Sequence, residues 1–546
     1  MCIFKSKREC GVALALSAAA FLLCWAVALT VYFPLPKIHD EFSTLLAVEI
    51  LAQGKLSAPP PAFREHFETV HVISAPRQMS KYLPGLALIL AASKIITGEV
   101  FWGQWLLFAL MIGSIFWVLS ALLPLSWAAL GAICAALQLG FVLEQHFFAT
   151  IGFGYWAHSY MNGALPAVGG ALMLGAFLRL REQGRISLGL GSSFMAGAII
   201  LLYTRPFEGA AWLLAISICF YSDVARLIRI SFRTSTFAWL ALQGLTAVGW
   251  LLYYNFQITG DPLKLPYVAY EEQYSGSPLF AWSNYSIPSQ ASTGFLQHYR
   301  QWEHALAGAV RAHGYIVEFI FVRLPDIFSF FLGQHLFALL LLLPLLSAAA
   351  PLRRLFLVLL LFLACLVPST FYLPHYVAPA TALFYLLMAA GLQVLRQRLR
   401  PSFILPLVPT AAVLFYLVGH AALVWYRSAQ FDYNSRWNVK RRQIEECLKK
   451  TTDRYLILVH YEPWHNAHFD WVHNAPDPLG QQVIWARSLG PDKDQQLIKA
   501  LQEIEVLRLF PDGKSTYLEG ASSVISRTAQ CAKLHLTTPD EMSLPQ

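Results

Sequence analysis

The chain has 546 residues, of which 56% are hydrophobic and only 13% are charged. Because about a quarter of the residues in a soluble domain are charged, this composition excludes an ordinary soluble protein. The formal net charge of +8 comes mostly from short basic loops between apolar segments. It therefore does not indicate binding to nucleic acid.

A series of apolar runs follows along the chain, each long enough or nearly long enough to cross a membrane. A transmembrane helix needs roughly 20 mostly apolar residues to cross about 30 Å of hydrocarbon. The runs cover residues 11–33, 101–123, 126–143, 163–178, 188–203, 207–221, 237–254, 328–350, 355–371, 377–395 and 403–425, with a shorter run at 84–97. We therefore predict an all-α polytopic membrane protein with about 11 to 13 transmembrane helices.

The first apolar run resembles a signal peptide at its start, because Lys5, Lys7 and Arg8 precede it. It continues to Phe33, which is too long for the apolar part of a signal peptide, and no small-x-small cleavage site follows. We expect a first helix that the protein retains.

The basic loops predict the orientation, because Lys and Arg are enriched in short cytoplasmic loops. Basic loops lie at the N-terminus and at 179–185, 226–233, 353–354 and 396–400. In the cytoplasmic (inner) membrane, this places the N-terminus inside, and the loops 34–82 and 257–326 and everything after Trp425 outside. Between Tyr82 and Asn162 the chain must then cross an even number of times: two crossings give about 11 spans, and four give about 13.

The composition changes after the transmembrane domain, which we assign to residues 1–426. Residues 427–546 hold β-like runs at 454–460, 482–486, 505–509 and 515–518, and a helical stretch at 493–503. This alternation predicts a small extracytoplasmic α/β domain. Cys447 and Cys531 both lie in it and could form a disulfide in an oxidising compartment.

The first external loop carries a pair of acidic residues, Asp40 and Glu41, directly after the first span. A short amphipathic helix is expected from Glu41 to Gln53, ended by Gly54. Asp40 could simply cap this helix. It could also be a carboxylate held at the membrane face beside an external cavity, and both interpretations can hold together.

Other polar residues also fall on the external side. Lys81 lies at the start of the apolar run 84–97, where a cation could bind lipid headgroups in general or hold one phosphate. Further candidates on the same side are Tyr82, His158, Tyr160, Arg205, Glu208, His375 and Tyr376. Arg205 and Glu208 are three residues apart, so they could also be a simple ion pair at a helix start.

This order of features resembles the GT-C superfamily of membrane glycosyltransferases. The shared features are a first helix, an external loop that opens with Asp-Glu, a Lys-Tyr-x-Pro-Gly motif at 81–85 and a His-Tyr-x-x-Pro motif at 375–379. The nearer relatives are protein O-mannosyltransferases and the aminoarabinose transferase of lipid A. The resemblance covers roughly residues 11–425.

The resemblance implies transfer of a sugar from a polyprenyl-phosphate donor to a lipid, glycan or protein acceptor outside the membrane, with inversion at the anomeric carbon. Asp40 matches the catalytic acidic position, with Glu41 beside it as the second catalytic candidate. Lys81 matches a lysine that holds the donor phosphate, and Arg205 and His375 are further phosphate-binding candidates. The expected lining of the substrate cavity is Tyr82, His158, Tyr160, Glu208 and Tyr376.

The sequence departs from the family at one motif, because Lys81 is followed by Tyr-Leu-Pro where relatives commonly have Pro-Pro. The register of Lys81 is therefore uncertain by about one residue. No cofactor follows from the resemblance with certainty, and a divalent cation stays an open alternative.

A histidine-rich stretch in the C-terminal part has no clear family match. It contains His460, His465, His468 and His473, with Glu462 and Asp470 between them. The pair His465 and His468 could bind a metal, or the stretch could form a loop rim or acceptor surface. Two other functions stay open for the whole chain: a transporter or flippase for a polyprenyl-linked substrate, and an enzyme like O-antigen ligase or polymerase.

Overall fold

The structure is a computed structural model. It describes residues 4–30, 33–140, 155–232, 234–289, 294–333, 338–346, 350–399, 408–430, 437–512 and 517–519. Two sequence predictions fall outside these residues: Cys531, as the proposed partner of Cys447, and a fourth crossing hidden at 145–156, most of which is not described.

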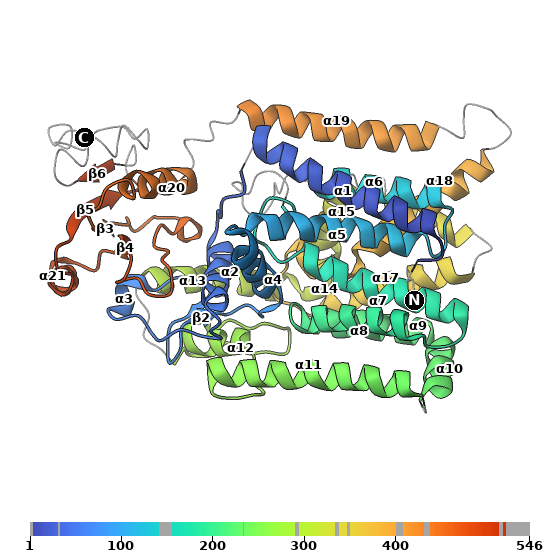
Figure 1. Ribbon diagram of the computed structural model, residues 1–546, viewed down its shortest axis with the longest axis horizontal. Helices are drawn as coiled ribbons and strands as arrows, with labels where there is room; N and C mark the ends of the chain where they lie inside the picture. The colour runs from blue at the N-terminus through green and yellow to red at the C-terminus, as the bar shows by residue number, and fades with distance from the viewer. Residues whose placement is uncertain are drawn as a thin grey trace.

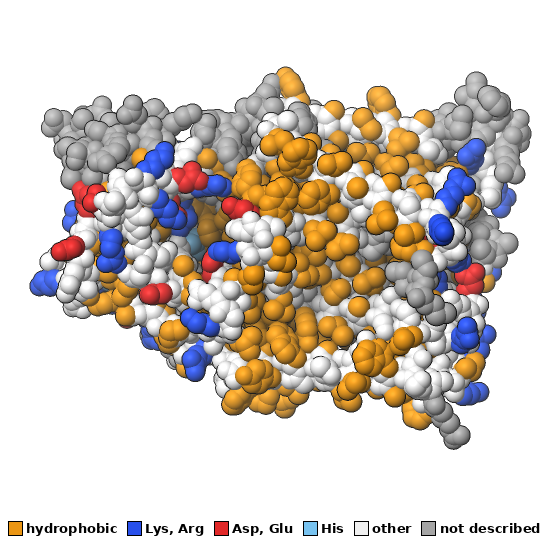
Figure 2. Space-filling model, in the orientation of Figure 1, with side chains coloured by type: hydrophobic (Ala, Val, Ile, Leu, Met, Phe, Trp, Pro, Cys, Tyr) orange, Lys and Arg blue, Asp and Glu red, His pale blue; other side chains and the backbone are white. Residues whose placement is uncertain are grey.

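Most of the chain forms a bundle of apolar helices (Figure 1). Its helices are α1 (Lys7–Thr30), α5 (Phe101–Leu119), α6 (Leu125–Gly140), α7 (Ala164–Gln183), α8 (Leu188–Leu202), α9 (Pro206–Cys219), α10 (Tyr221–Ser231), α11 (Ser235–Thr259), α15 (Leu324–Leu332), α16 (Leu339–Leu342), α17 (Ala350–Leu366), α18 (Thr381–Arg398) and α19 (Val408–Gln430). Helices suit a membrane because every backbone polar group is satisfied within the segment. Figure 2 shows a broad apolar band across the bundle, with Lys, Arg, Asp and Glu gathered at its two ends.

Five helices in the described residues are long and apolar enough to cross a membrane. They are α1, α5, α7, α11 and the continuous segment Pro374–Arg398, and the pair α9 and α10, bent by 96°, gives a sixth. Shorter apolar helices lie at Gly85–Thr97, Leu125–Gly140, Leu188–Leu202 and Thr410–Ala422. The protein is therefore a multi-pass membrane protein, as the sequence predicts.

The short apolar run at 84–97 becomes α4 (Gly85–Thr97). At 1.5 Å per residue its 13 residues extend about 20 Å, less than the 30 Å or so of the hydrocarbon layer. It packs against α2 (His39–Ala52), and Lys94 of α4 forms an ion pair with Glu49 of α2. By itself, α4 is therefore too short to cross the membrane.

The two predicted external loops fold into a layer at the end of the bundle that faces the C-terminal domain (Figure 1). The first loop forms α2, α3 (Arg64–Phe67) and a hairpin of β1 (Val72–Ile73) and β2 (Met79–Ser80). The second forms α12 (Pro266–Tyr270), the π-helix η1 (Glu271–Ser275), α13 (Gly294–His313), α14 (Tyr315–Glu318) and the π-helix η2 (Phe319–Arg323). Short 3₁₀ segments, η4 (Leu343–Leu346) and η5 (Pro374–Ala380), interrupt the later helices.

The C-terminal domain is the small α/β domain that the sequence predicts. It consists of α20 (Trp437–Leu448), β3 (Tyr455–Val459), η8 (Ala467–Phe469), β4 (Val483–Arg487), α21 (Pro491–Ala500), β5 (Glu505–Phe510) and β6 (Tyr517–Glu519). The strand order is β4-β3-β5-β6, with β3 parallel to β4 and β5, and β6 antiparallel to β5. Every residue of β3 and β4 is buried because α20 and α21 cover opposite faces of the sheet.

Specific contacts fix this domain on the first external loop. Phe67 of α3 packs into the core beneath the sheet. His66 Nδ1 lies 2.8 Å from the Arg487 carbonyl oxygen, and the Arg487 guanidinium donates to the Glu68 carbonyl over 2.8 Å. Asn438 donates to the Pro36 carbonyl over 3.0 Å. Because α2 lies between Pro36 and α3, these contacts place the histidine-rich stretch over the start of α2.

Candidate active site

Asp40 lies in the first turn of α2. The helix begins at His39, its N-cap residue is Ile38, and no side chain caps it. The interpretation of Asp40 as the helix cap is therefore wrong. A carboxylate in the first turn is still favoured by the positive end of the helix dipole, and it is free to act on other groups.

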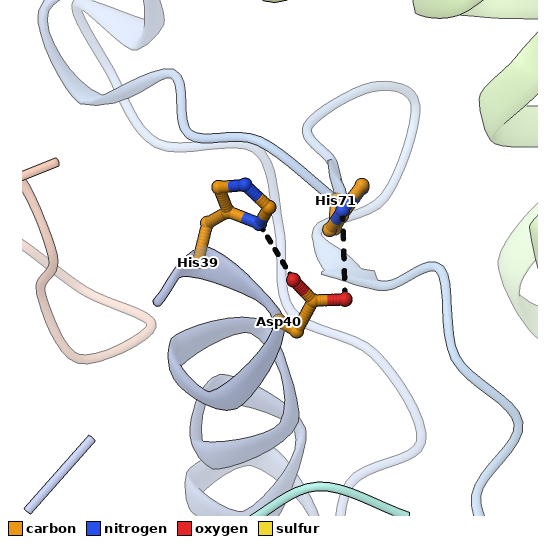
Figure 3. A group of neighbouring side chains, drawn as sticks. All are labelled: His39, Asp40 and His71. Carbon is orange, nitrogen blue, oxygen red and sulfur yellow. Dashed lines mark ion pairs between the residues drawn. The ribbon is translucent and has the colours of Figure 1, made fainter. Parts of the chain in front are cut away.

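The Asp40 carboxylate contacts three side chains, of which Figure 3 shows His39 and His71. His39 Nδ1 lies 2.9 Å from Oδ2, and His71 Nε2 lies 3.7 Å from Oδ1. The Tyr82 hydroxyl donates a short hydrogen bond to Oδ1. Burial opposes ionisation, but His71, His39 and the Tyr82 hydroxyl outweigh it and hold the pKa of Asp40 well below its usual value. The carboxylate is therefore ionised and able to accept a proton.

His71 has an unusual backbone, with φ at +66°. This left-handed conformation is uncommon for a residue other than glycine and persists only where the surroundings enforce it. Here the Tyr270 hydroxyl accepts from the His71 N–H over 3.1 Å, and the Ser43 hydroxyl donates to the His71 carbonyl over 2.6 Å. The backbone N–H of Lys81 donates to the same carbonyl over 3.0 Å. These bonds aim the His71 ring at Asp40.

Glu41, the second catalytic candidate, is fully buried, and its carboxylate binds backbone groups. Its two oxygens accept the backbone N–H groups of Lys37, over 2.7 Å, and Tyr160, over 2.9 Å. Burial raises the pKa of Glu41, while the Lys37 charge and these N–H groups oppose the increase. These hydrogen bonds hold the start of α2 against the segment around Tyr160, so Glu41 stabilises the fold.

A small, partly open cavity lies beside Asp40. Its lining comes from α2, the 80–87 segment, the 160–162 segment, the start of α9 and η5. The predicted site residues in the lining are Asp40, Tyr82, Tyr160, Arg205 and His375. Tertiary folding thus collects five predicted residues, far apart in sequence, around one space.

Arg205 is the cation of this cavity. Its guanidinium lies over the Tyr376 ring, 4.3 Å from the centroid, and 3.6 Å from the Glu208 carboxylate. The predicted ion pair at this helix start is therefore present, and Tyr376 and Glu208 orient Arg205 rather than line the cavity. His375 Nδ1 lies 2.8 Å from the Tyr155 hydroxyl, which fixes its ring.

Lys81 does not line the cavity. Its buried ammonium lies 3.2 Å from Glu271 Oε1 and 4.6 Å from the ring centroids of both Tyr267 and Tyr270. Burial opposes the charge, but Glu271 and Glu303 outweigh it and raise the pKa of Lys81. Lys81 is thus a charged lysine that already has a carboxylate partner.

Glu303 of α13 is the second carboxylate near Lys81. Burial and the charge of Glu271 raise the pKa of Glu303 to about 8, although Lys81 lowers it. The Ser275 hydroxyl donates to Glu303 Oε2 over 2.6 Å. Sequence reasoning missed this pair of glutamates because nothing in a loop sequence distinguishes a buried carboxylate from an exposed one. His158, by contrast, was predicted for the cavity but is buried beside Trp105 and is not in its lining.

The histidine-rich stretch reaches the site through one residue. His468 Nδ1 lies 2.9 Å from His39 Nε2. The other three histidines contact Phe510 (His460), Asp512 (His465) and Phe42 (His473). His465 and His468, the pair considered as metal ligands, therefore serve different neighbours. Burial, and then the nearby His39, lower the pKa of His468 to about 3, so its ring is neutral.

Among the described residues, His39, Asp40 and His71 form a group that could hold a metal ion. Each offers one ligand atom, and these atoms lie within 4.8 Å of one another. Imidazole nitrogens with one carboxylate oxygen suit zinc and similar ions. The sequence held one indication of this group, the adjacency of His39 to Asp40, and none that pointed to His71.

Comparisons with known proteins are consistent with this architecture. No protein-family model and no curated protein matches the sequence. The fold is similar to that of ArnT from Cupriavidus metallidurans in the apo state, with a TM-score of 0.51, 11% identity, and coverage of 91% of this chain and 93% of that chain. The same enzyme bound to undecaprenyl phosphate gives a TM-score of 0.54 and 12% identity, with the same coverage.

An oligosaccharyltransferase from Archaeoglobus fulgidus in the apo form matches less well, with a TM-score of 0.47, 10% identity, and coverage of 91% of this chain and 69% of that chain. At such identities the similarity concerns the fold. ArnT, the aminoarabinose transferase of lipid A, belongs to the GT-C superfamily, as the sequence motifs suggested. The chain is thus a multi-pass membrane protein with the GT-C fold and a small C-terminal α/β domain.

Proposed function

We propose that this protein transfers a sugar from a polyprenyl-phosphate carrier to an acceptor at the external face of the cytoplasmic membrane. The observation that carries the proposal is the cavity where the Asp40 carboxylate and the Arg205 guanidinium face the same space. A related fold, that of ArnT, has been solved with undecaprenyl phosphate bound. A lipid-linked donor can keep its chain in the bilayer while its phosphate enters this cavity.

In the proposed reaction, an acceptor hydroxyl oxygen attacks the anomeric carbon of the sugar. The bond from that carbon to the phosphate oxygen breaks, and polyprenyl phosphate leaves with the electron pair. Asp40 accepts the hydroxyl proton as general base. Arg205, with His375 beside it, stabilises the charge that grows on the departing phosphate. Direct displacement inverts the anomeric configuration.

Lys81 keeps a place in this proposal as a second cation behind the cavity. It can bind the donor phosphate only if Glu271 releases it, because the two groups lie 3.2 Å apart. We therefore rank Arg205 ahead of Lys81 for direct phosphate contact. Tyr82 connects Lys81 with the cavity, because it is the next residue in the chain and its hydroxyl donates to Asp40.

The proposed topology places the N-terminus in the cytoplasm and both the cavity and the C-terminal domain outside. The last turn of α7, which contains Arg181, leads into a loop at the end of the bundle opposite the C-terminal domain (Figure 1), as expected when positively charged loops stay inside. A divalent cation on His39, Asp40 and His71 is the remaining cofactor option; it would neutralise charge at the reacting centre. Activity after exhaustive treatment with EDTA, with and without added Zn²⁺, Mg²⁺ or Mn²⁺, tests that option.

The decisive experiment compares Asp40→Asn with the wild type in a transfer assay with a polyprenyl-phosphate sugar. Asparagine keeps the shape of the side chain, and Asp40 does not cap the helix, so folding should be preserved. Loss of the base should lower the rate by about 10²–10⁴-fold. Full activity of the folded Asp40→Asn protein would refute the role of Asp40 as the base. Absence of transfer by the wild-type protein would refute the glycosyltransferase proposal and favour a transporter for the same lipid.

A further inference from the structure

A chain of side chains connects the C-terminal domain to Asp40. His39 contacts the Asp40 carboxylate through Nδ1, over 2.9 Å, and the His468 ring through Nε2, over 2.9 Å. Asp40 and His39 belong to α2, whereas His468 belongs to η8 of the C-terminal domain. Each nitrogen of the His39 ring thus has a neighbour: Nδ1 faces Asp40 of the same helix, and Nε2 faces His468 of the C-terminal domain.

The His39 ring is held from both sides. The Asp40 carboxylate lies at its Nδ1 edge, and the His468 ring lies at its Nε2 edge. A group that contacts one nitrogen of a histidine ring also fixes how the other nitrogen faces its own partner. His468 therefore orients the His39 ring towards Asp40.

The surroundings hold His468 for this contact. The Trp302 ring lies edge-on to it at 4.7 Å between centroids, and Tyr299 packs against both His468, at 5.7 Å, and His39, at 4.9 Å. The backbone N–H of His468 donates to the Asn466 side chain over 3.0 Å. Trp302 and Tyr299 come from α13, so the second external loop and the C-terminal domain together build this position.

We propose that His468 is a positioning residue for Asp40, and that the docked C-terminal domain is therefore part of the catalytic centre. This inference rests on the proposed function, in which Asp40 is the base. It assigns a task to the C-terminal domain: undocking removes the His468 ring that orients His39, and transfer slows even though the cavity beside Asp40 stays intact.

The test compares two substitutions of His468 in the full-length protein. His468→Asn places an amide near the position of Nδ1 and keeps a hydrogen-bonding group there, whereas His468→Leu removes that group. Loss of a residue that orients a reacting group typically costs 10–100-fold in activity. We expect kcat to fall by this factor in His468→Leu, with the KM for the polyprenyl-phosphate sugar within twofold of wild type, and His468→Asn to recover most of it. His460→Leu, in the same stretch but stacked on Phe510, should keep wild-type kcat.

The outcomes separate this inference from the proposed function. Full kcat in His468→Leu while Asp40→Asn is inactive overturns only the positioning role, and so does an equal loss in His468→Leu and His468→Asn. Active Asp40→Asn refutes the role of Asp40 on which this inference rests, and absence of transfer by the wild-type protein refutes the proposed function itself. Independently of activity, the ring ¹⁵N signals of His39 in histidine-labelled protein should shift between the wild type and His468→Leu, because the variant loses the contact at Nε2. An unchanged His39 signal in that variant overturns the inference.

Discussion

Substitutions of Glu41 separate an effect on folding from an effect on catalysis most clearly. Its carboxylate is fully buried and accepts two backbone N–H groups, those of Lys37 and Tyr160. A buried donor that loses its acceptor costs about 1–3 kcal/mol. Glutamine keeps one acceptor oxygen, so Glu41→Gln should lower the free energy of unfolding by about 1–3 kcal/mol. Alanine removes both acceptors, so Glu41→Ala should cost about 2–6 kcal/mol by the same reasoning.

The matched control is Glu49→Gln, the same change on the same helix. Glu49 is half-exposed and pairs with Lys94 near the surface, where an ion pair contributes about 0–1 kcal/mol. Thermal and denaturant unfolding in detergent would measure stability, and transfer by the remaining folded protein would measure catalysis. We expect Glu41→Gln to lose stability while its rate stays well above that of Asp40→Asn. A Glu41→Gln protein as stable as wild type but inactive would move the catalytic base to Glu41.

Three further predictions follow from the charges around the cavity and at the membrane. Lys81→Ala should be unstable, because the buried Glu271 carboxylate loses its partner. The double variant Lys81→Met/Glu271→Gln should regain stability. If this double variant also regains full transfer activity, Lys81 does not bind the donor phosphate. The pKa of Glu303 is raised to about 8. Above about pH 4.5 the folded protein therefore keeps a proton on Glu303 that the unfolded chain has lost. The free energy of unfolding decreases as the pH rises from about 4.5 towards 8, because over this range only the folded state binds the proton. Glu303→Gln should therefore raise the thermal midpoint relative to wild type more at pH 8 than at pH 5, and an equal effect at both values would contradict the assignment. A phosphatase fused after Trp425 should be active and a fluorescent protein there dark, whereas fluorescence would overturn the proposed topology.

The sequence by itself determined the class of protein. Apolar runs the length of a bilayer can bury their backbone polar groups only as helices, so the bundle follows from local composition. The alternating short runs after residue 427 likewise predicted the small α/β domain, in which β3 and β4 are continuous apolar stretches. The helix after Asp40 and its end near Gly54, where φ is +73°, were also predictable from local signals.

The tertiary structure alone decided which of the candidate polar residues act together. Arg205 and His375 face Asp40 although more than 160 residues separate each of them from it. Lys81 lies in the expected place in the chain but pairs with Glu271, and Glu41 supports the backbone. His71 and His468 reach Asp40 and His39 only because two loops and a separate domain dock on one helix. The physical reason is that burial and hydrogen-bond partners of a polar side chain come from contacts distant in sequence, whereas helix and strand formation depends on neighbours along the chain.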